Sequence, residues 1–132
     1  MVTLNIQPAH AAVLEGEREV VLTDRTTLPM QVNGLTLHLG PRSFFQTNTE
    51  MAERLYASAA ELAGLTGRQR VFDLYCGIGT IGIALSLEAR EVIGVEIVEE
   101  AVADAIANAE LNGIDNARFY AGDIRTAMRP LI

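Results

Sequence analysis

The segment Asp73–Gly82, with the sequence DLYCGIGTIG, constrains the fold of this 132-residue chain more than any other. It contains the spacing G-x-G-x-x-G between a run that predicts a strand and a run that predicts a helix. There, Gly77 and Gly79 allow a sharp turn and close approach to a ligand, and Gly82 allows a helix to pack tightly on the strand. The motif therefore predicts an α/β unit that holds a nucleotide-like cofactor.

Strands and helices alternate around this motif. The pattern predicts strands over 70–75, 91–96 and 117–121, and helices over 49–63, 80–88 and 99–111. Strands separated by helices of this length imply right-handed crossovers and a parallel sheet. Threonine at position 47 or asparagine at position 48 can cap the first helix, and a glycine at position 64 can end it.

The N-terminal third has a different pattern. Asn33-Gly34 predicts a tight turn in a hairpin over 30–39, and 19–23 is a further strand candidate. We therefore expect a β-rich segment over 1–45, followed by part of a Rossmann-like domain over 46–132. Because the chain stops before a fourth parallel strand, we interpret it as a fragment with an open sheet edge, through which it could self-associate.

Composition limits the classes of function. The chain is 49% hydrophobic but only 5% aromatic, which is typical of an aliphatic core in a parallel sheet covered by helices. Its 10 basic and 17 acidic residues give a net charge of −7, which argues against binding nucleic acid on its own. No apolar run approaches the length of a membrane span, and no metal site is expected. One cysteine, Cys76, excludes an internal disulfide and fits the cytoplasm.

Acidic side chains at the strand ends separate two possible cofactors. The pyrophosphate of a dinucleotide disfavours a nearby carboxylate, whereas S-adenosylmethionine carries a cationic ammonium and sulfonium. Asp73, four residues before Gly77, suits the cationic ligand. Glu96, 19 residues after Gly77, could accept hydrogen bonds from ribose hydroxyls of either cofactor. Asp123 could accept from an adenine amino group or cap a helix.

Two segments together resemble the RNA uracil-C5 methyltransferases, which make 5-methyluridine in ribosomal and transfer RNA. They are Ser43–Asn48, SFFQTN, and Asp73–Thr80, DLYCGIGT. The similarity extends from about residue 30 to about residue 125. The pairing of F-x-Q-x-N with D-L-Y/F-C-G-x-G is far more specific than the glycines alone.

The resemblance implies the Rossmann-like fold of the S-adenosylmethionine-dependent methyltransferases, with Gln46, Tyr75, Glu96 and Asp123 as cofactor contacts. Gln46 would reach the methionine part, and Tyr75 would flank the glycine loop. Thr80 stands where many members have Asn, and keeps a polar side chain there. The neighbouring phenylalanines, at 44 and 45, are expected to pack in the core.

The resemblance also implies chemistry that this chain lacks. The family has a D-P-P-R-type strand end, then a nucleophilic Cys that adds to C6 of uracil, then a Glu that acts as base. Cys76 lies in the cofactor loop instead, and we do not expect it to be the nucleophile. The chain would thus be the inactive cofactor-binding part of an enzyme that methylates 23S ribosomal RNA or transfer RNA, with the RNA held by other parts.

Three alternatives remain open from the residues alone. An NAD-dependent oxidoreductase shares the glycines and Glu96, but leaves Asp73 and the SFFQTN segment unexplained. A non-catalytic cofactor-binding or interaction module that ends here is a second possibility. A methyltransferase acting on another base is a third, since the tetrapeptide that distinguishes such enzymes would lie beyond this chain.

Overall fold

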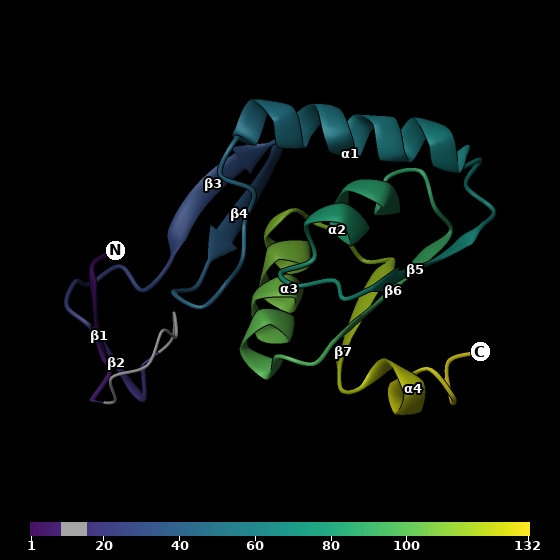
Figure 1. The fold of residues 1–132 in the computed structure, drawn as a ribbon. Helices are drawn as coiled ribbons and strands as arrows, with labels where there is room; N and C mark the ends of the chain where they lie inside the picture. Colours follow the sequence, from purple (N-terminus) through teal and green to yellow (C-terminus); the bar gives the residue numbers. More distant parts are fainter. Residues whose placement is uncertain (9–15) are drawn as a thin grey trace.

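A computed structural model describes residues 1–8 and 16–132 (Figure 1). An antiparallel pair, a hairpin and a parallel α/β unit succeed one another along the chain. The elements, in order, are β1 (Thr3–Ile6), β2 (Arg18–Val21), β3 (Leu28–Val32), β4 (Leu35–Leu39), α1 (Thr49–Ala63), β5 (Arg70–Leu74), α2 (Thr80–Ser86), β6 (Glu91–Glu96), α3 (Glu99–Leu111), β7 (Ala117–Ala121) and α4 (Ile124–Ala127).

The parallel sheet has the strand order β5-β6-β7. Val71 pairs with Val92, and Val92 pairs with Ala117, so the three carboxyl ends lie at one edge. Helix α2 packs on β5 and β6, helix α3 packs on β6 and β7, and the two helices touch each other. The predicted alternation of strand and helix is therefore confirmed, and it brings the ends of β5 and β6 together beside the glycine loop.

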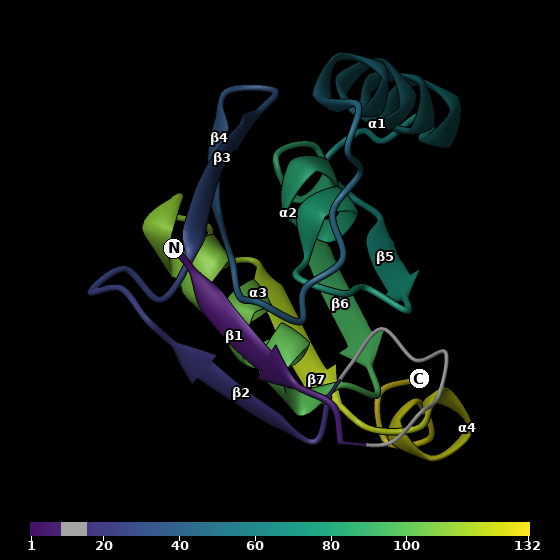
Figure 2. The same cartoon turned by 60° about the vertical axis from the view of Figure 1, so that its left-hand side comes forward.

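The β3–β4 hairpin lies against α3 (Figure 2). Asn33 and Gly34 both have positive φ, at 47° and 78°, which the tight two-residue turn between Val32 and Leu35 requires. Leu35, Leu37 and Leu39 are buried, while the residues between them are half-buried. The predicted hairpin is confirmed, although β3 begins two residues earlier than expected, at Leu28.

Helix α1 has the caps that its sequence predicts. Asn48 Oδ1 accepts from the Met51 amide at 3.1 Å, and Gly64 ends the helix with φ of 56°. The helix buries Ala52 and Tyr56, four residues apart on one face. No helix in the described ranges, 1–8 and 16–132, is both long and apolar enough to cross a membrane.

One hydrophobic cluster joins the hairpin to the parallel unit. It contains buried side chains of β3 and β4, of α1, of the glycine loop, and of α2, α3 and β7. Its largest fully buried members include Leu37, Ile78 and Ile83. Because the hairpin and the glycine loop share this cluster, they pack as one body around α3.

The structure differs from the sequence-based expectation at further places, and the strand predicted over 19–23 is β2, which covers Arg18–Val21. Strand β1 and the short helix α4 were not predicted, since Thr3–Ile6 and Ile124–Ala127 are only four residues long. Strand β5 ends at Leu74 because Tyr75 adopts a left-handed φ of 63°, which no strand accommodates. Helix α2 ends at Ser86, two residues early, where the Ser86 hydroxyl donates to Ile83 O at 2.6 Å.

A substitution at Gly94 tests the packing in the middle of the parallel sheet. A Cβ added there would overlap the Phe119 ring and lie 2.9 Å from Cys76 Sγ. We expect Gly94→Ala to lower the free energy of unfolding by about 1–3 kcal/mol through overpacking, measured by urea denaturation. In a Phe119→Leu background the same change should cost at least about 0.5 kcal/mol less. Equal costs in the two backgrounds would contradict the assigned clash.

Candidate functional site

A hollow of about 300 Å³ opens at the carboxyl ends of β5 and β6. Six of the eight residues predicted to bind cofactor line it: Gln46, Asp73, Tyr75, Gly77, Thr80 and Glu96. The other described lining residues are Phe44, Phe45, Leu55, Tyr56, Cys76, Ile78 and Ile81. The structure thus gathers residues that are up to 52 positions apart in the sequence, Phe44 and Glu96, into one pocket. The remaining two predicted residues, Gly79 and Asp123, do not line it.

The floor of the pocket is the glycine loop. Tyr75, Gly77 and Gly79 have φ of 63°, 53° and 83°, which turns the chain from β5 into α2. A Cβ at Gly79 would lie 3.0 Å from the Phe119 ring and 3.1 Å from Ala105. Gly79 therefore serves the close packing of the loop on α3 and β7, and it positions α2 as the helix N-cap.

Asp73 lies near the end of β5, under the glycine loop. Its Oδ2 accepts a hydrogen bond of 2.8 Å from the Gly82 amide in the first turn of α2. Burial raises the pKa of this carboxyl to about 6, the Gly82 amide opposes the rise, and the nearby Glu96 charge adds to it. Asp73 thus fixes the helix to the strand and places a half-buried acid at the pocket.

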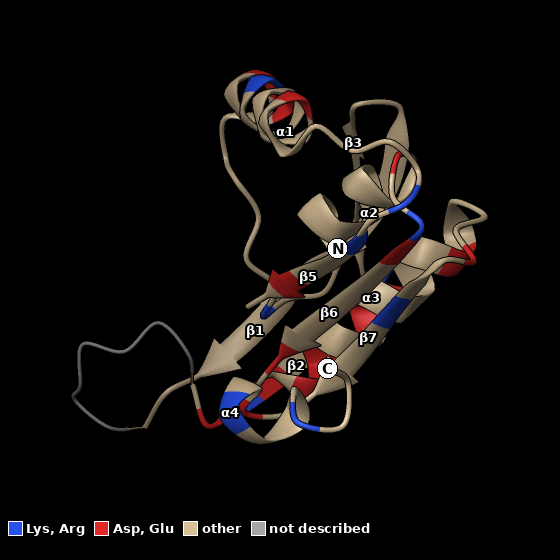
Figure 3. Ribbon diagram, turned by 90° about the vertical axis from the view of Figure 1, so that its right-hand side faces the viewer, with Lys and Arg blue, Asp and Glu red and all other residues tan. Residues whose placement is uncertain are grey.

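Glu96, the last residue of β6, holds the loop from the other side. Its Oε2 accepts from the Gly77 amide at 3.1 Å, and its Oε1 accepts from the Ile97 and Val98 amides at 2.8 and 3.0 Å. These bonds orient the carboxylate at the pocket wall. Acidic residues therefore lie at or near the ends of both strands that border the pocket (Figure 3).

Cys76 is the single cysteine of the chain and lies buried in the loop. Burial, with the charges of Asp73 and Glu96, raises the pKa of its thiol to about 12. The thiol is therefore protonated at neutral pH, whereas a nucleophile must be a thiolate. This environment agrees with the expectation that Cys76 is not a nucleophile.

Aromatic side chains form the rim. Phe44 and Tyr75 are 78% and 79% exposed, while Phe45 packs against the core cluster. The expectation of core packing is confirmed for Phe45 and is wrong for Phe44. Successive side chains in the extended segment after β4 point to opposite sides. The Phe45 ring therefore faces the core and the Phe44 ring faces outward.

Asp123 lies one residue after the contact between the ends of β6 and β7, where the Gly122 amide donates to Glu96 O at 2.8 Å. Its Oδ1 caps α4 by accepting from the Arg125 amide at 2.9 Å, and its Oδ2 pairs with the Arg125 guanidinium at 2.8 Å. These bonds with the Arg125 side chain and amide lower the pKa of Asp123 to about 2. The capping role that the sequence left open is present.

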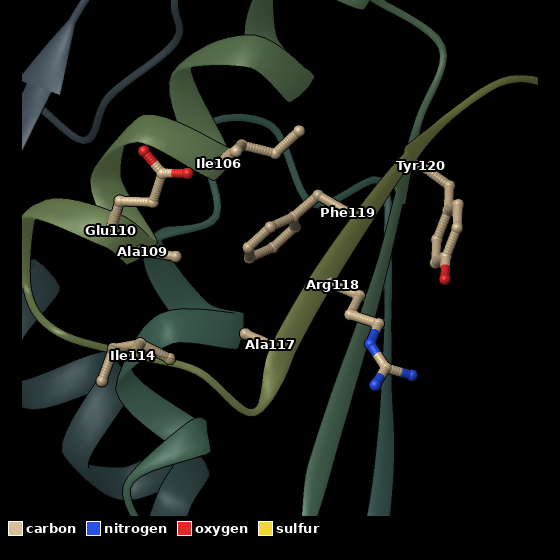
Figure 4. A pocket seen from close by; sticks show the side chains of 8 residues that line it. All are labelled: Ile106, Ala109, Glu110, Ile114, Ala117, Arg118, Phe119 and Tyr120. Carbon is tan, nitrogen blue, oxygen red and sulfur yellow. The ribbon is translucent and has the colours of Figure 1, made fainter.

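A second hollow, of about 400 Å³, lies between α3 and β7 (Figure 4). Phe119 points toward α3 there, and Ile106, Ala109 and Ile114 provide much of its apolar lining. It contains none of the predicted cofactor-binding residues. Polar groups do not converge in it, so it is a weaker candidate for a specific site.

Apart from Thr80, sequence reasoning missed the pocket residues that come from helices. Leu55 and Tyr56 of α1 and Ile81 of α2 line the pocket, although helical spacing marks them as ordinary apolar residues. Their part in the pocket results from how α1 packs over α2, which no local pattern encodes. The helical spacing of Met51, Leu55, Ala59 and Leu62 marked a different face of α1 from the one that is buried, which carries Ala52 and Tyr56.

The fold and the site together define a Rossmann-like α/β domain with a hollow at the carboxyl ends of its first two parallel strands, where domains of this kind bind ligands. Residues 13–129 match the family model described as tRNA (Uracil-5-)-methyltransferase. The chain belongs to this family. Its fold is that of the S-adenosylmethionine-dependent methyltransferases, as the sequence predicted. The oxidoreductase alternative is thereby excluded.

Individual relatives agree with this assignment. A 23S rRNA (uracil(747)-C(5))-methyltransferase of Halothiobacillus neapolitanus is 47% identical over 92% of this chain and 32% of its own length. One of Shewanella loihica is 42% identical over 93% of this chain and 32% of its own. The crystal structure of Pyrococcus abyssi tRNA (uracil-54, C5)-methyltransferase in complex with S-adenosyl-L-homocysteine is 29% identical, with a TM-score of 0.73 over 92% of this chain and 30% of that one. The chain spans about a third of the length of these relatives.

The raised pKa of Asp73 predicts a pH dependence of stability. Between pH 3.8, the ordinary pKa, and about 6, the folded chain binds more protons at this site than the unfolded chain. The stability that Asp73 contributes at low pH is therefore lost as the pH rises through 6. Asp73→Asn keeps an acceptor for the Gly82 amide but has no charge to bury. The free energy of unfolding of Asp73→Asn minus that of the wild type should therefore rise by up to about 3 kcal/mol from pH 4 to pH 7. Urea denaturation of both proteins at both pH values measures this difference in the free energy of unfolding. The same difference at pH 4 and pH 7 would contradict the raised pKa assigned to Asp73.

Proposed function

We propose that the pocket binds S-adenosylmethionine, and that this chain is the methyl-donor-binding part of an RNA uracil-C5 methyltransferase. The observation that carries the proposal is the charge of the pocket. Asp73 and Glu96 are acidic, and none of the described lining residues is Lys, Arg or His. A pocket of this charge fits a ligand with an ammonium and a sulfonium group.

The hydrogen bonds of the glycine loop support a cationic ligand over a pyrophosphate. A dinucleotide places its pyrophosphate on amides at the start of the helix after the loop. Here the Gly82 amide donates to Asp73, the Gly77 amide donates to Glu96, and the Gly79 amide donates to Cys76 O. Carboxylates thus occupy amides that a phosphate would need, and their charge would repel it.

Each predicted contact has a role in this proposal. Glu96 accepts from ribose hydroxyls; a carboxylate has about four acceptor sites, of which backbone amides use three here. One ribose hydroxyl can therefore donate to the free acceptor site on Oε2. A second hydroxyl can donate to Oε2 only if the hydrogen bond from the Gly77 amide breaks. Asp73 attracts the cationic end of the ligand. Asp123 lies outside the pocket lining, two residues after β7, and its carboxylate pairs with Arg125; the free acceptor site on Oδ2 would accept from the adenine amino group of a ligand that extends past the pocket.

The remaining contacts lie around the loop. Gln46 reaches the methionine part from the segment after β4, and Tyr75 flanks the loop at the exposed rim. Gly77 lets the ligand approach the backbone, Gly79 sets the loop on α3, and the Thr80 side chain adds a polar group to the pocket.

For the whole enzyme we propose methyl transfer to C5 of a uracil in RNA. When bound, S-adenosylmethionine supplies a methyl group attached to a sulfonium. This chain binds and orients the donor, and its buried Cys76 thiol takes no covalent part. Ribosomal RNA is the favoured substrate, because the two relatives named above for 23S rRNA are 47% and 42% identical, whereas the tRNA (uracil-54, C5)-methyltransferase is 29% identical. Such a substrate supports a cytoplasmic location.

We also propose that the chain by itself associates through an open sheet edge. Within the described residues, β5 and β7 each pair with β6 alone, so each has one side without a neighbouring strand. Unpaired strand edges attract other strands. Sedimentation equilibrium should show a mass that rises with concentration, whereas a constant monomer mass at high concentration would refute the association.

Glu96→Gln tests whether the Glu96 carboxylate binds the ligand. Removing the charge should weaken binding of S-adenosylhomocysteine by about 1.5–3 kcal/mol, as expected for hydrogen bonds to a charged group, measured by isothermal titration calorimetry. Glu91→Gln is the matched control, because Glu91 lies at the opposite end of the same strand and pairs with Arg70 and Arg118. Equal affinity in the wild type and Glu96→Gln would remove Glu96 from the site.

A further inference from the structure

Strand β4 is attached to α3 by side chains that take the place of a neighbouring strand. Asn108 Oδ1 accepts from the His38 amide at 2.7 Å, and its Nδ2 donates to His38 O at 3.2 Å. Asn112 does the same one helical turn later, with 2.9 Å to the Thr36 amide and 2.7 Å to Thr36 O. Each asparagine therefore binds both backbone groups of one residue, as a paired strand would.

The geometry of the two elements makes this match possible. In an antiparallel pair, every second residue of a strand points its backbone groups away from its partner. Val32 and Leu35 flank the tight turn, so Thr36 and His38 point outward, toward α3. Four residues of helix rise about 6 Å and two residues of strand rise about 6.8 Å, so side chains four apart on α3 meet residues two apart on β4.

The series continues toward the pocket. Asp104, four residues before Asn108, accepts from the Gly40 amide at 3.0 Å and from the Ser43 hydroxyl at 2.7 Å. The next three residues, Phe44 to Gln46, line the pocket. The wall of the pocket after β4 is therefore placed by its attachment to α3.

Asn108 also binds the glycine loop, the floor of the pocket. Its Nδ2 donates to Ile78 O at 3.3 Å, in the glycine loop, and its side chain is fully buried. One amide group thus binds β4 and the loop at the same time. A shift of β4 relative to the glycine loop would break a hydrogen bond of this amide and leave buried polar atoms without partners. The free-energy cost of such atoms opposes the shift.

We propose that Asn108 and Asn112 are positioning residues for the ligand pocket. By holding β4 on α3, they set the Phe44–Gln46 wall against the glycine loop. Docking of the hairpin on α3 and binding of ligand in the pocket then strengthen each other. The proposal rests on the proposed function of the pocket. Because such coupling is reciprocal, bound ligand must stabilise the hairpin by the factor by which the docked hairpin stabilises bound ligand.

Asn112→Ala tests the positioning role, with Asn116→Ala as a matched control. Asn116 Nδ2 also makes two bonds to backbone, with Ser86 O at 2.8 Å and Ala89 O at 3.0 Å, but neither residue lines the pocket. Both variants should lower Tm. Asn112→Ala should weaken binding of S-adenosylhomocysteine about 3- to 10-fold, and Asn116→Ala should leave it within about twofold. Equal affinities in Asn112→Ala and the wild type, or equal losses in the two variants, would overturn the proposal.

Hydrogen exchange of the wild-type chain supplies a second measurement that requires no variant. S-adenosylhomocysteine should slow exchange of the Thr36 and His38 amides, which donate to the two asparagines. Unchanged exchange of these amides at saturating ligand would overturn the coupling. Failure of the wild type to bind S-adenosylhomocysteine would instead contradict the proposed function, so the two ideas fail separately.

Discussion

The arrangement of the pocket depends on two carboxylates that accept hydrogen bonds from the glycine loop and from the helix that follows it. Glu96 binds the Gly77 amide in the loop and Asp73 binds the Gly82 amide in the first turn of α2, so the ends of β6 and β5 are fixed to the loop and to the start of the helix. The cost is electrostatic, since burial and mutual repulsion raise the pKa of Asp73 to about 6. A cation in the pocket would relieve that cost, which links the stability of the loop to the kind of ligand it accepts.

Helix α3 connects this loop to the rest of the chain. Its apolar face, with Ala101, Ala105 and Ala109, joins the core, and its polar row from Asp104 to Asn112 holds the hairpin. Small residues let the loop approach closely, as the 3.1 Å from Ala105 to a Cβ at Gly79 shows. The helix thereby acts as a common support for the glycine loop and for the Phe44–Gln46 wall of the pocket.

Much of the fold and part of the site can be predicted from the sequence. The glycine spacing, the Asn33-Gly34 turn and the Asn48 cap are local signals with local causes, and each predicted its element. Phe44 was misplaced because two adjacent aromatic residues give no sign of which one faces the core. Asn108 gave no signal either, since a buried asparagine in a helix is recognisable only once β4 and Ile78 are beside it. The binding roles of the pocket residues stay predictions.

The charge of the pocket is the central claim, and calorimetric titration of the 132-residue chain with S-adenosylhomocysteine and with NAD tests it most directly. The two ligands share an adenosine but differ in the group attached to it, which is an amino acid on a thioether in one and a pyrophosphate in the other. Binding of S-adenosylhomocysteine without binding of NAD is the expected result. Binding of NAD, or failure of S-adenosylhomocysteine to bind, would contradict a pocket in which carboxylates have taken the amides that a phosphate needs.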